Sequence, residues 1–313
     1  MTKVRELCDA ETPLSGVMVA ALTFATAADA QGPLRKMMMK RWMERQQQQQ
    51  QSGPAGTDIA YGSDPLQHLD FWRATRKDGA APLVIFVHGG GWEKGDKEMA
   101  RGSAKVSHSL ERGYAFASVG YRLVPSATVE QQAQDVADAI AVLVRQAATL
   151  GIDSRRIVLM GHSAGAHLAA LVGTDPHYLD HAHLHPDALK GVILLDGAAY
   201  DVPRQIAEGG TFMHDRYLEA FGSDPARQKA LSPTFHAAAP NVPSFLILHV
   251  ARADGTAQSE QLGEVLRKAG TPAEVQGFAG SGLKGHMAIN RQLCEKDYPA
   301  TPVVDAYLDR VFA

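Results

Sequence analysis

The sequence has 313 residues, of which 45% are apolar and 21% are charged, and its formal net charge is -3. A chain of this length and composition is able to bury a full core and is typical of a soluble globular protein. The charge balance argues against nucleic acid as a partner, because surfaces that bind nucleic acid are strongly basic. We therefore expect a small-molecule partner.

The first 30 residues have the pattern of a secretory signal. Lys3 and Arg5 precede an apolar stretch that ends in the small-residue pattern Ala28-Asp29-Ala30. This pattern predicts a signal peptide over 1–30, cleavage after Ala30 and a periplasmic or secreted mature chain. A membrane anchor or a helix of the domain is the alternative, although the apolar run is short for crossing a bilayer.

Residues 31–56 form a basic, glutamine-rich arm and linker. The segment combines five basic residues and one acidic residue with a glutamine tract and a Gly/Pro stretch. We expect a solvated tether, with weak contact to an anionic membrane surface or a flap over the domain as alternatives. Cleavage would remove Cys8 and leave Cys294 alone, so no internal disulfide is expected in the mature chain.

From Thr57 to the C-terminus, apolar runs of strand length alternate with longer helical patterns. This alternation predicts one domain over 57–313 with an α/β fold, in which helices cover both faces of a doubly wound, mostly parallel sheet. The predicted strands are 69–74, 83–87, 115–121, 157–160, 192–195, 245–250 and 274–278. Ligands bind at the carboxyl ends of the strands in such sheets, so functional residues should follow strands directly.

A candidate nucleophile follows the fourth of these strands. The pentapeptide Gly161-His162-Ser163-Ala164-Gly165 matches G-x-S-x-G and lies between the apolar run "IVLM" and the helical pattern "AHLAAL". Glycines two residues on either side of a serine allow the sharp strand-to-helix turn of a nucleophile elbow. The motif predicts that Ser163 is a nucleophile, and a structural turn serine is the alternative.

The segment "HGGGW" at residues 88–92, placed about 75 residues before "GHSAG", resembles the α/β-hydrolase superfamily. The similar branch contains hormone-sensitive-lipase-like esterases, kynurenine-formamidase-like enzymes and bacterial feruloyl or acetyl esterases. This resemblance runs from about Tyr61 to the C-terminus and implies an oxyanion hole formed by the N–H groups of Gly90, Gly91 and Ala164, with Gly89 needed for the turn. A phosphate-binding glycine loop is the rival, but its Lys-Ser/Thr ending is missing.

A serine nucleophile needs a base, and the fold requires the chain order Ser, acid, His. His286 lies on a late, glycine-punctuated loop and is the predicted base. Asp254 follows the strand at 245–250 and is the predicted acid, which would orient the histidine. Asp196 and Asp201, after the preceding strand, are the alternatives.

A histidine cluster lies beyond the nucleophile helix. His177, His181, His183 and His185 resemble a metal site by composition alone, and we expect a solvated loop instead. No metal and no organic cofactor is required by a serine hydrolase of this kind. The expected site therefore consists of protein groups alone.

Two side chains are candidates for substrate contact, namely Trp92 after the glycines and Tyr200 after the strand at 192–195. The long segment between Asp201 and Leu231 is expected to form a helical cap. Within it, Phe212, Met213, Tyr217 and Phe221 would wall a pocket or pack in the core. Ser126 replaces the glutamate of the "YRLAPE" form, and this favours the formamidase and feruloyl-esterase side of the branch.

These features predict a serine carboxylesterase that hydrolyses a small to medium carboxylic ester through an acyl-enzyme. An arylformamidase with the same triad is the first alternative, although export argues against intracellular kynurenine metabolism. A transacylase is a further alternative, because an alcohol can intercept the same intermediate. A noncatalytic binding module is the alternative from a different class, but the Ser, His and glycine positions are all intact. The pattern leaves the acyl group, the alcohol and the oligomeric state open.

Overall fold

The structure is a computed structural model that describes residues 53–75, 79–208, 210–238 and 240–313. The predicted signal peptide over 1–30, its cleavage after Ala30 and nearly all of the arm at 31–56 lie outside the described residues, so they stay predictions. Of the described residues, no helix has the length and apolar character needed to cross a membrane.

One eight-stranded sheet runs through the described residues, in the order β1-β2-β4-β3-β5-β6-β7-β8. Neighbouring strands are parallel from β4 through β3, β5, β6 and β7 to β8, whereas β2 pairs antiparallel with both β1 and β4. The strands are β1 (Thr57–Ala60), β2 (His68–Trp72), β3 (Ala81–Val87), β4 (Ala115–Val119), β5 (Ile152–His162), β6 (Gly191–Leu195), β7 (Phe245–Ala251) and β8 (Ala273–Ser281). This arrangement confirms the predicted doubly wound, mostly parallel α/β fold.

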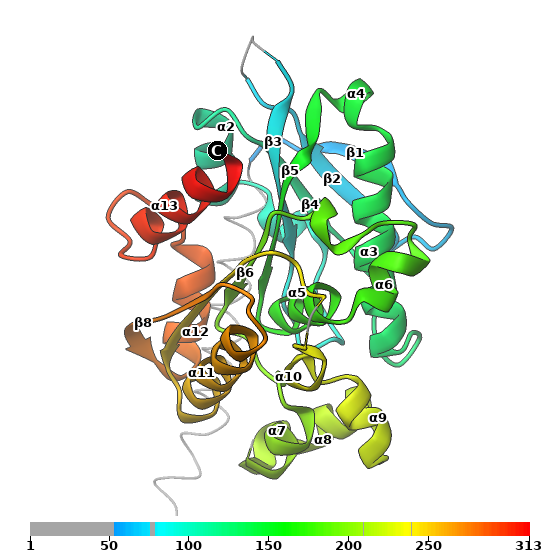
Figure 1. Ribbon diagram of the computed structural model, residues 1–313, viewed down its shortest axis with the longest axis vertical. Helices are drawn as coiled ribbons and strands as arrows, with labels where there is room; N and C mark the ends of the chain where they lie inside the picture. The colour runs from blue at the N-terminus through cyan, green and yellow to red at the C-terminus, as the bar shows by residue number, and fades with distance from the viewer. Residues whose placement is uncertain (1–52, 76–78, 209, 239) are drawn as a thin grey trace, which may run out of the picture. The chain divides into compact units, whose positions relative to one another are not determined.

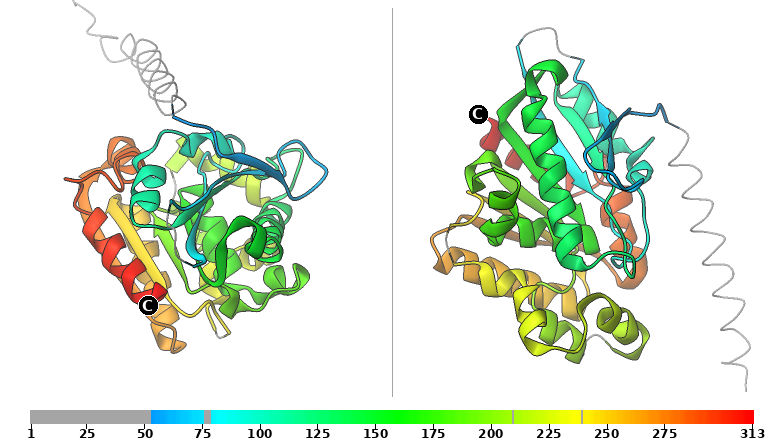
Figure 2. Two further views of the ribbon diagram at one scale, coloured as in Figure 1. Left: turned by 90° about the horizontal axis from the view of Figure 1, so that it is seen from above. Right: turned by 90° about the vertical axis from the view of Figure 1, so that its right-hand side faces the viewer.

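Helices cover both faces of the sheet, as Figures 1 and 2 show. The helices are η1 (Lys97–Ala100), α2 (Ala104–Glu111), α3 (Val129–Arg145), α4 (Ala147–Leu150), α5 (Ala164–Thr174), α6 (Pro176–His181), η2 (Pro186–Ala188), α7 (Val202–Glu208), α8 (Gly210–Phe221), α9 (Pro225–Ala230), α10 (Pro233–His236), α11 (Ala253–Lys268), α12 (Gly282–Arg291) and α13 (Thr301–Phe312). One face packs against α3, α5 and α11, and the other packs against α2, α12 and α13.

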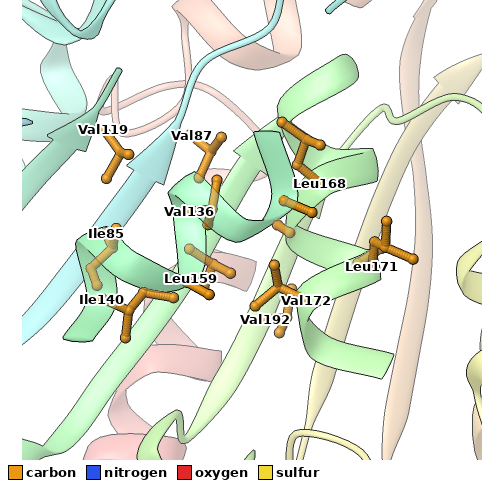
Figure 3. Packing of buried hydrophobic residues seen from close by; sticks show 14 of the residues in the cluster. Ile85, Val87, Val119, Val136, Ile140, Leu159, Leu168, Leu171, Val172 and Val192 are labelled. Atoms are coloured by element: carbon orange, nitrogen blue, oxygen red, sulfur yellow. The ribbon is translucent and has the colours of Figure 1, made fainter. Parts of the chain in front are cut away.

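The alternation of side chains along β3 separates the two cores. Leu83, Ile85 and Val87 join the cluster with α3 and α5, whereas Val84 and Phe86 join the cluster with α2, α12 and α13. Successive side chains of a strand point to opposite faces, so a continuous apolar run fills both cores. Figure 3 shows part of the first cluster, where the labelled residues are Ile85, Val87, Val119, Val136, Ile140, Leu159, Leu168, Leu171, Val172 and Val192.

The segment after β6 is helical, as expected, and Figure 1 shows α7, α8 and α9 gathered beyond one end of the sheet. We call these three helices the cap. One anchor of the cap is a bidentate ion pair in which Arg227 of α9 donates to Glu130 of α3 over 2.7 and 2.8 Å. Such a fork-to-carboxylate pair fixes orientation as well as distance. The cap is thereby tied to the helix layer that covers the sheet.

Candidate active site

Ser163 lies at the sharp turn between β5 and α5, with φ 55° and ψ -119°. This conformation is strained for a residue with a side chain, and such strain is typical of functional positions. A β-carbon on Gly161 would collide with the carbonyl of Gly165, and one on Gly165 would collide with the carbonyl of Val87. Both glycines of G-x-S-x-G are therefore needed for close backbone approach, and Ser163 itself remains partly exposed.

The glycine run forms a turn directly beside this serine. A β-carbon built on Gly89 would lie 2.9 Å from Cβ of Ser163, and Gly90 and Gly91 have φ values of 141° and 63°. Within the described part of the chain, the N–H groups of Gly90, Gly91 and Ala164 donate no hydrogen bond. Unpaired N–H donors next to a serine hydroxyl are what an oxyanion hole needs.

The side chain of Trp92 is buried beneath this turn and is not accessible to a substrate. It is 1% exposed and packs edge-on against Phe221 and Tyr217 of the cap, with ring centroids 4.7 and 6.1 Å away. Its indole N–H donates to Nδ1 of His167, so Nε2–H of that ring donates to the carbonyl of Leu231 over 2.8 Å. Burial lowers the pKa of His167 to about 4, which keeps this ring neutral. We therefore correct the expected substrate contact of Trp92.

The expected contact of Tyr200 is corrected for the same reason, because its side chain is fully buried. Tyr217 and Phe221 are core residues around Trp92, while Met213 is partly buried against the same core. The side chain of Phe212 lies outside the described residues. The expectation of a pocket wall at these cap positions is therefore replaced by packing at Tyr217 and Phe221.

His286 lies on α12, is 8% exposed, and pairs with a carboxylate at the end of β6. Nδ1 of His286 is 2.5 Å from Oδ2 of Asp196, which is fully buried. Nδ1–H donates to the carboxylate, and this tautomer leaves Nε2 unprotonated and able to accept a proton.

Asp196 is itself held on several sides. Its Oδ1 accepts from the backbone N–H of Val250 over 3.1 Å, and Oδ2 lies 3.1 Å from Nε of Arg252. The backbone of Asp196 has φ 43°, in the left-handed region that aspartate tolerates better than most side chains. A backbone N–H and a guanidinium therefore fix the position of this buried carboxylate beside His286.

The expected acid, Asp254, does not pair with His286. Its Oδ2 accepts from Nε2 of Gln205 over 3.1 Å at the start of α11. Burial raises the pKa of Asp254, but Arg252 and the bond from Gln205 outweigh that effect and lower it. The assignment of Asp254 as the partner of the histidine is therefore wrong, and Asp196 occupies that position. The other alternative, Asp201, accepts from the N–H of Arg204.

The residue before the nucleophile connects Ser163 to the histidine helix. Nε2 of His162 bonds to the carbonyl of His286 over 3.0 Å, and the two rings lie 4.5 Å apart. Burial and the neighbouring His286 keep the pKa of His162 well below its ordinary value. His162 is therefore a neutral link that holds His286 beside the elbow.

The histidine cluster after α5 is tied to nearby carboxylates. His177 pairs with Asp175 over 2.6 Å, and His185 pairs with Asp187 over 2.9 Å. Within the described ranges, no group of three or more His, Cys, Asp or Glu side chains is arranged to hold a metal ion.

Two cations near the site were missed by the sequence reasoning. Arg252 contacts Asp196 and donates to the carbonyl of Gly197 over 3.0 Å. Arg216 of α8 lies against Gly91 and pairs with Glu93 over 3.1 Å. The sequence could have indicated Arg252, because it lies directly after a predicted buried strand. No sequence pattern indicated Arg216, because only the fold of the cap brings it to the glycine turn.

A family of known proteins matches the part of the chain that carries the glycine turn and Ser163. Residues 69–193 match the family described as BD-FAE, which covers β2 to β6 and includes the glycine turn and Ser163. The match stops before Asp196, Asp254 and His286.

Curated relatives include esterases and a formamidase. Esterase LipC of Mycobacterium tuberculosis is 31% identical over 212 residues, covering 62% of this chain and 50% of that protein. Kynurenine formamidase of Danio rerio is 31% identical over 146 residues, covering 46% of each chain. The chain spans half or less of the length of the curated relatives that it matches.

The fold has close counterparts among solved structures. Esterase B from Lactobacillus Rhamnosis superimposes with a TM-score of 0.71 at 23% identity, covering 91% of this chain and 95% of that one. At this identity the likeness establishes the fold. Together with the partial family match and the curated relatives, it makes the chain similar to α/β-hydrolase esterases in its fold and in the segment that carries the glycine turn and Ser163.

Proposed function

We propose that this protein is a serine carboxylesterase that hydrolyses a small to medium carboxylic ester through an acyl-enzyme. The proposal rests on the pair of His286 and Asp196, 2.5 Å apart, held beside an elbow serine and three unpaired N–H groups. The esterases among its relatives support the same class of reaction.

In the first half-reaction, Oγ of Ser163 attacks the ester carbonyl carbon. Nε2 of His286 accepts the hydroxyl proton, and Asp196 stabilises the imidazolium through Nδ1–H. The N–H groups of Gly90, Gly91 and Ala164 would receive the negative charge on the carbonyl oxygen. Each such donor contributes about 2.7 to 4 kcal/mol to stabilisation of the transition state in enzymes of this kind.

Collapse of the tetrahedral intermediate breaks the bond to the alcohol oxygen, which takes the proton from Nε2 of His286. Water then attacks the acyl-enzyme, with the same histidine as base, and the acid leaves as Ser163 regains its proton. An alcohol in place of water would give transacylation. Every proton in this cycle passes through His286.

The test is hydrolysis of p-nitrophenyl esters of increasing acyl length by the parent and by Ser163→Ala and His286→Ala. We expect each substitution to lower kcat by about 10⁴-fold or more, because the triad acts as a unit. The matched controls are Ser126→Ala and His181→Ala, which alter exposed residues of the same types. Variants that fold and retain parental turnover would overturn the proposed triad.

An arylformamidase is the second candidate, supported by the similarity to the kynurenine formamidase. The same serine would attack the formyl carbon of an N-formyl amide, and the amine would leave with the proton of His286. Comparison of kcat/KM for N-formylkynurenine and for p-nitrophenyl acetate separates the two candidates. If the folded protein hydrolyses neither class, a noncatalytic binding role takes their place.

A further inference from the structure

We propose that Arg216 of the cap is an anion anchor at the edge of the oxyanion hole, and that the preferred ester carries a carboxylate. This inference rests on the proposed esterase function and narrows its substrate class. It starts from the position of Arg216, which lies on α8, about 125 residues along the chain from the glycine turn that it contacts.

Arg216 lies directly against Gly91. A β-carbon built on that glycine would be 2.9 Å from Cδ and 3.6 Å from Nη1 of the arginine. The absence of a side chain at Gly91 therefore allows the guanidinium to reach the turn. A cation this close to the expected oxyanion hole can contact an anionic group that the substrate carries near its reacting carbonyl.

The position of Arg216 is defined on two sides. Its Nε lies 3.1 Å from Oε2 of Glu93, which follows the buried Trp92. The next residue of α8, Tyr217, packs edge-on against that same Trp92. Glu93 of the turn and the packing of α8 therefore fix the position of the guanidinium. A cation whose position is fixed in advance binds an anion at lower entropic cost.

Part of the guanidinium remains free to bind. The side chain of Arg216 is 37% exposed, and the described residues offer Nη1 and Nη2 no hydrogen-bond partner. Glu93 also lies 3.6 Å from Lys94, so this acid is shared between two cations and the group keeps an excess positive charge. An arginine fork with free terminal nitrogens matches a carboxylate in geometry and charge.

The test compares esters that differ only in the anionic group. On the acyl side, mono-p-nitrophenyl adipate replaces the terminal methyl group of p-nitrophenyl hexanoate with a carboxylate. On the alcohol side, 3-carboxyphenyl butyrate is compared with phenyl butyrate. The measured quantity is the ratio of kcat/KM for the anionic ester to kcat/KM for the neutral ester, in parent, Arg216→Gln, Glu93→Gln and Lys94→Gln.

In at least one pair, Arg216→Gln should lower this ratio by about tenfold or more, since a charge-assisted hydrogen bond is lost. The loss should fall mainly on KM of the anionic ester, because the anchor contacts a group remote from the chemistry. Glu93→Gln should raise the ratio, because a competing carboxylate is removed. The matched control, Lys94→Gln, removes a more exposed cation beside the same acid and should leave the ratio within about twofold.

Two results would overturn the inference. If Arg216→Gln lowers kcat of the anionic and neutral esters by one common factor, the arginine supports the oxyanion hole and not a substrate anion. If the ratio does not move in either pair, no anion is bound there. The neutral esters test the esterase function separately from the anion anchor. Their hydrolysis by the parent, and its loss in Ser163→Ala, depend on the esterase function alone.

Discussion

Two aspartates compete for the role of acid, and their surroundings distinguish them. Asp196 follows β6, is fully buried and contacts His286, Val250 and Arg252. Asp254 lies in the first turn of α11, is partly exposed and contacts Gln205. Only the buried carboxylate is in position to orient the imidazole and stabilise its charged form.

At this scale we predict that Asp196→Asn lowers kcat of ester hydrolysis by about 10³- to 10⁴-fold, because the amide no longer holds the productive tautomer of His286. The measurement is steady-state kinetics on p-nitrophenyl butyrate, with circular dichroism to verify folding.

The matched control is Asp254→Asn. It makes the same chemical change at an aspartate that lies three residues after the end of β7, in the first turn of α11. We expect its kcat to stay within about tenfold of the parent, because the change alters the bond from Gln205 and the attraction to Arg252 but no hydrogen bond of His286. The reverse order of effects would restore Asp254 as the acid.

At the scale of elements, α12 matters most, because it carries His286 near its middle. The carbonyl of Asn290 near its C-terminal end accepts from Nζ of Lys105 on α2 over 2.5 Å. Lys105 is 2% exposed, and its ammonium also lies 5.1 Å from the ring centroid of Phe86. A cation at a helix C-terminus complements the helix dipole, but burial opposes its charge.

Burial lowers the pKa of Lys105 to about 8. Between pH 8 and the ordinary lysine pKa, the unfolded chain therefore holds more protons than the folded one, and this residue makes stability rise with pH. We predict that the free energy of unfolding of the parent, minus that of Lys105→Met, rises by about 1 to 2 kcal/mol from pH 8 to pH 9.5.

Urea denaturation of both proteins at several pH values between 7 and 9.5 measures this difference, and taking the difference cancels the titration of groups common to both. The matched control is Lys229→Met, which changes an exposed lysine of α9. A difference that stays level across this range would contradict a buried, titrating Lys105.

At the scale of the whole molecule, catalysis and folding depend on the same sheet. The parallel strands β4, β3, β5, β6 and β7 are covered on both faces, and Ser163 and Asp196 both lie at carboxyl ends of strands. The core clusters that the described residues form, and all proposed catalytic residues, lie within 53–313.

We therefore predict that a chain beginning at Gly53 folds cooperatively and keeps kcat/KM for p-nitrophenyl butyrate within about threefold of the full chain. Thermal unfolding and steady-state kinetics provide the measurements, and a chain beginning at Gln31 is the control. A folded but inactive short chain would instead favour the arm as a flap over the site.

Much of the fold was predictable because its signals are local. The apolar runs at 83–87 and 245–250 match β3 and β7 to within about two residues. By contrast, β1 was missed because "TDIA" is short, largely exposed and carries little apolar pattern. The start of β5 was missed because residues 153–156, "DSRR", are all polar and carry no apolar pattern.

The sequence by itself determined the turns around Ser163 and Gly89 to Gly91, because a glycine's backbone freedom is a property of neighbours along the chain. Only the tertiary structure decided between Asp196 and Asp254, since the distance to His286 depends on how β6, β7 and α12 pack. It also decided that Trp92 and Tyr200 are buried and that Arg216 reaches Gly91. Contacts between distant segments leave no local pattern, because they arise only when the sheet and cap assemble.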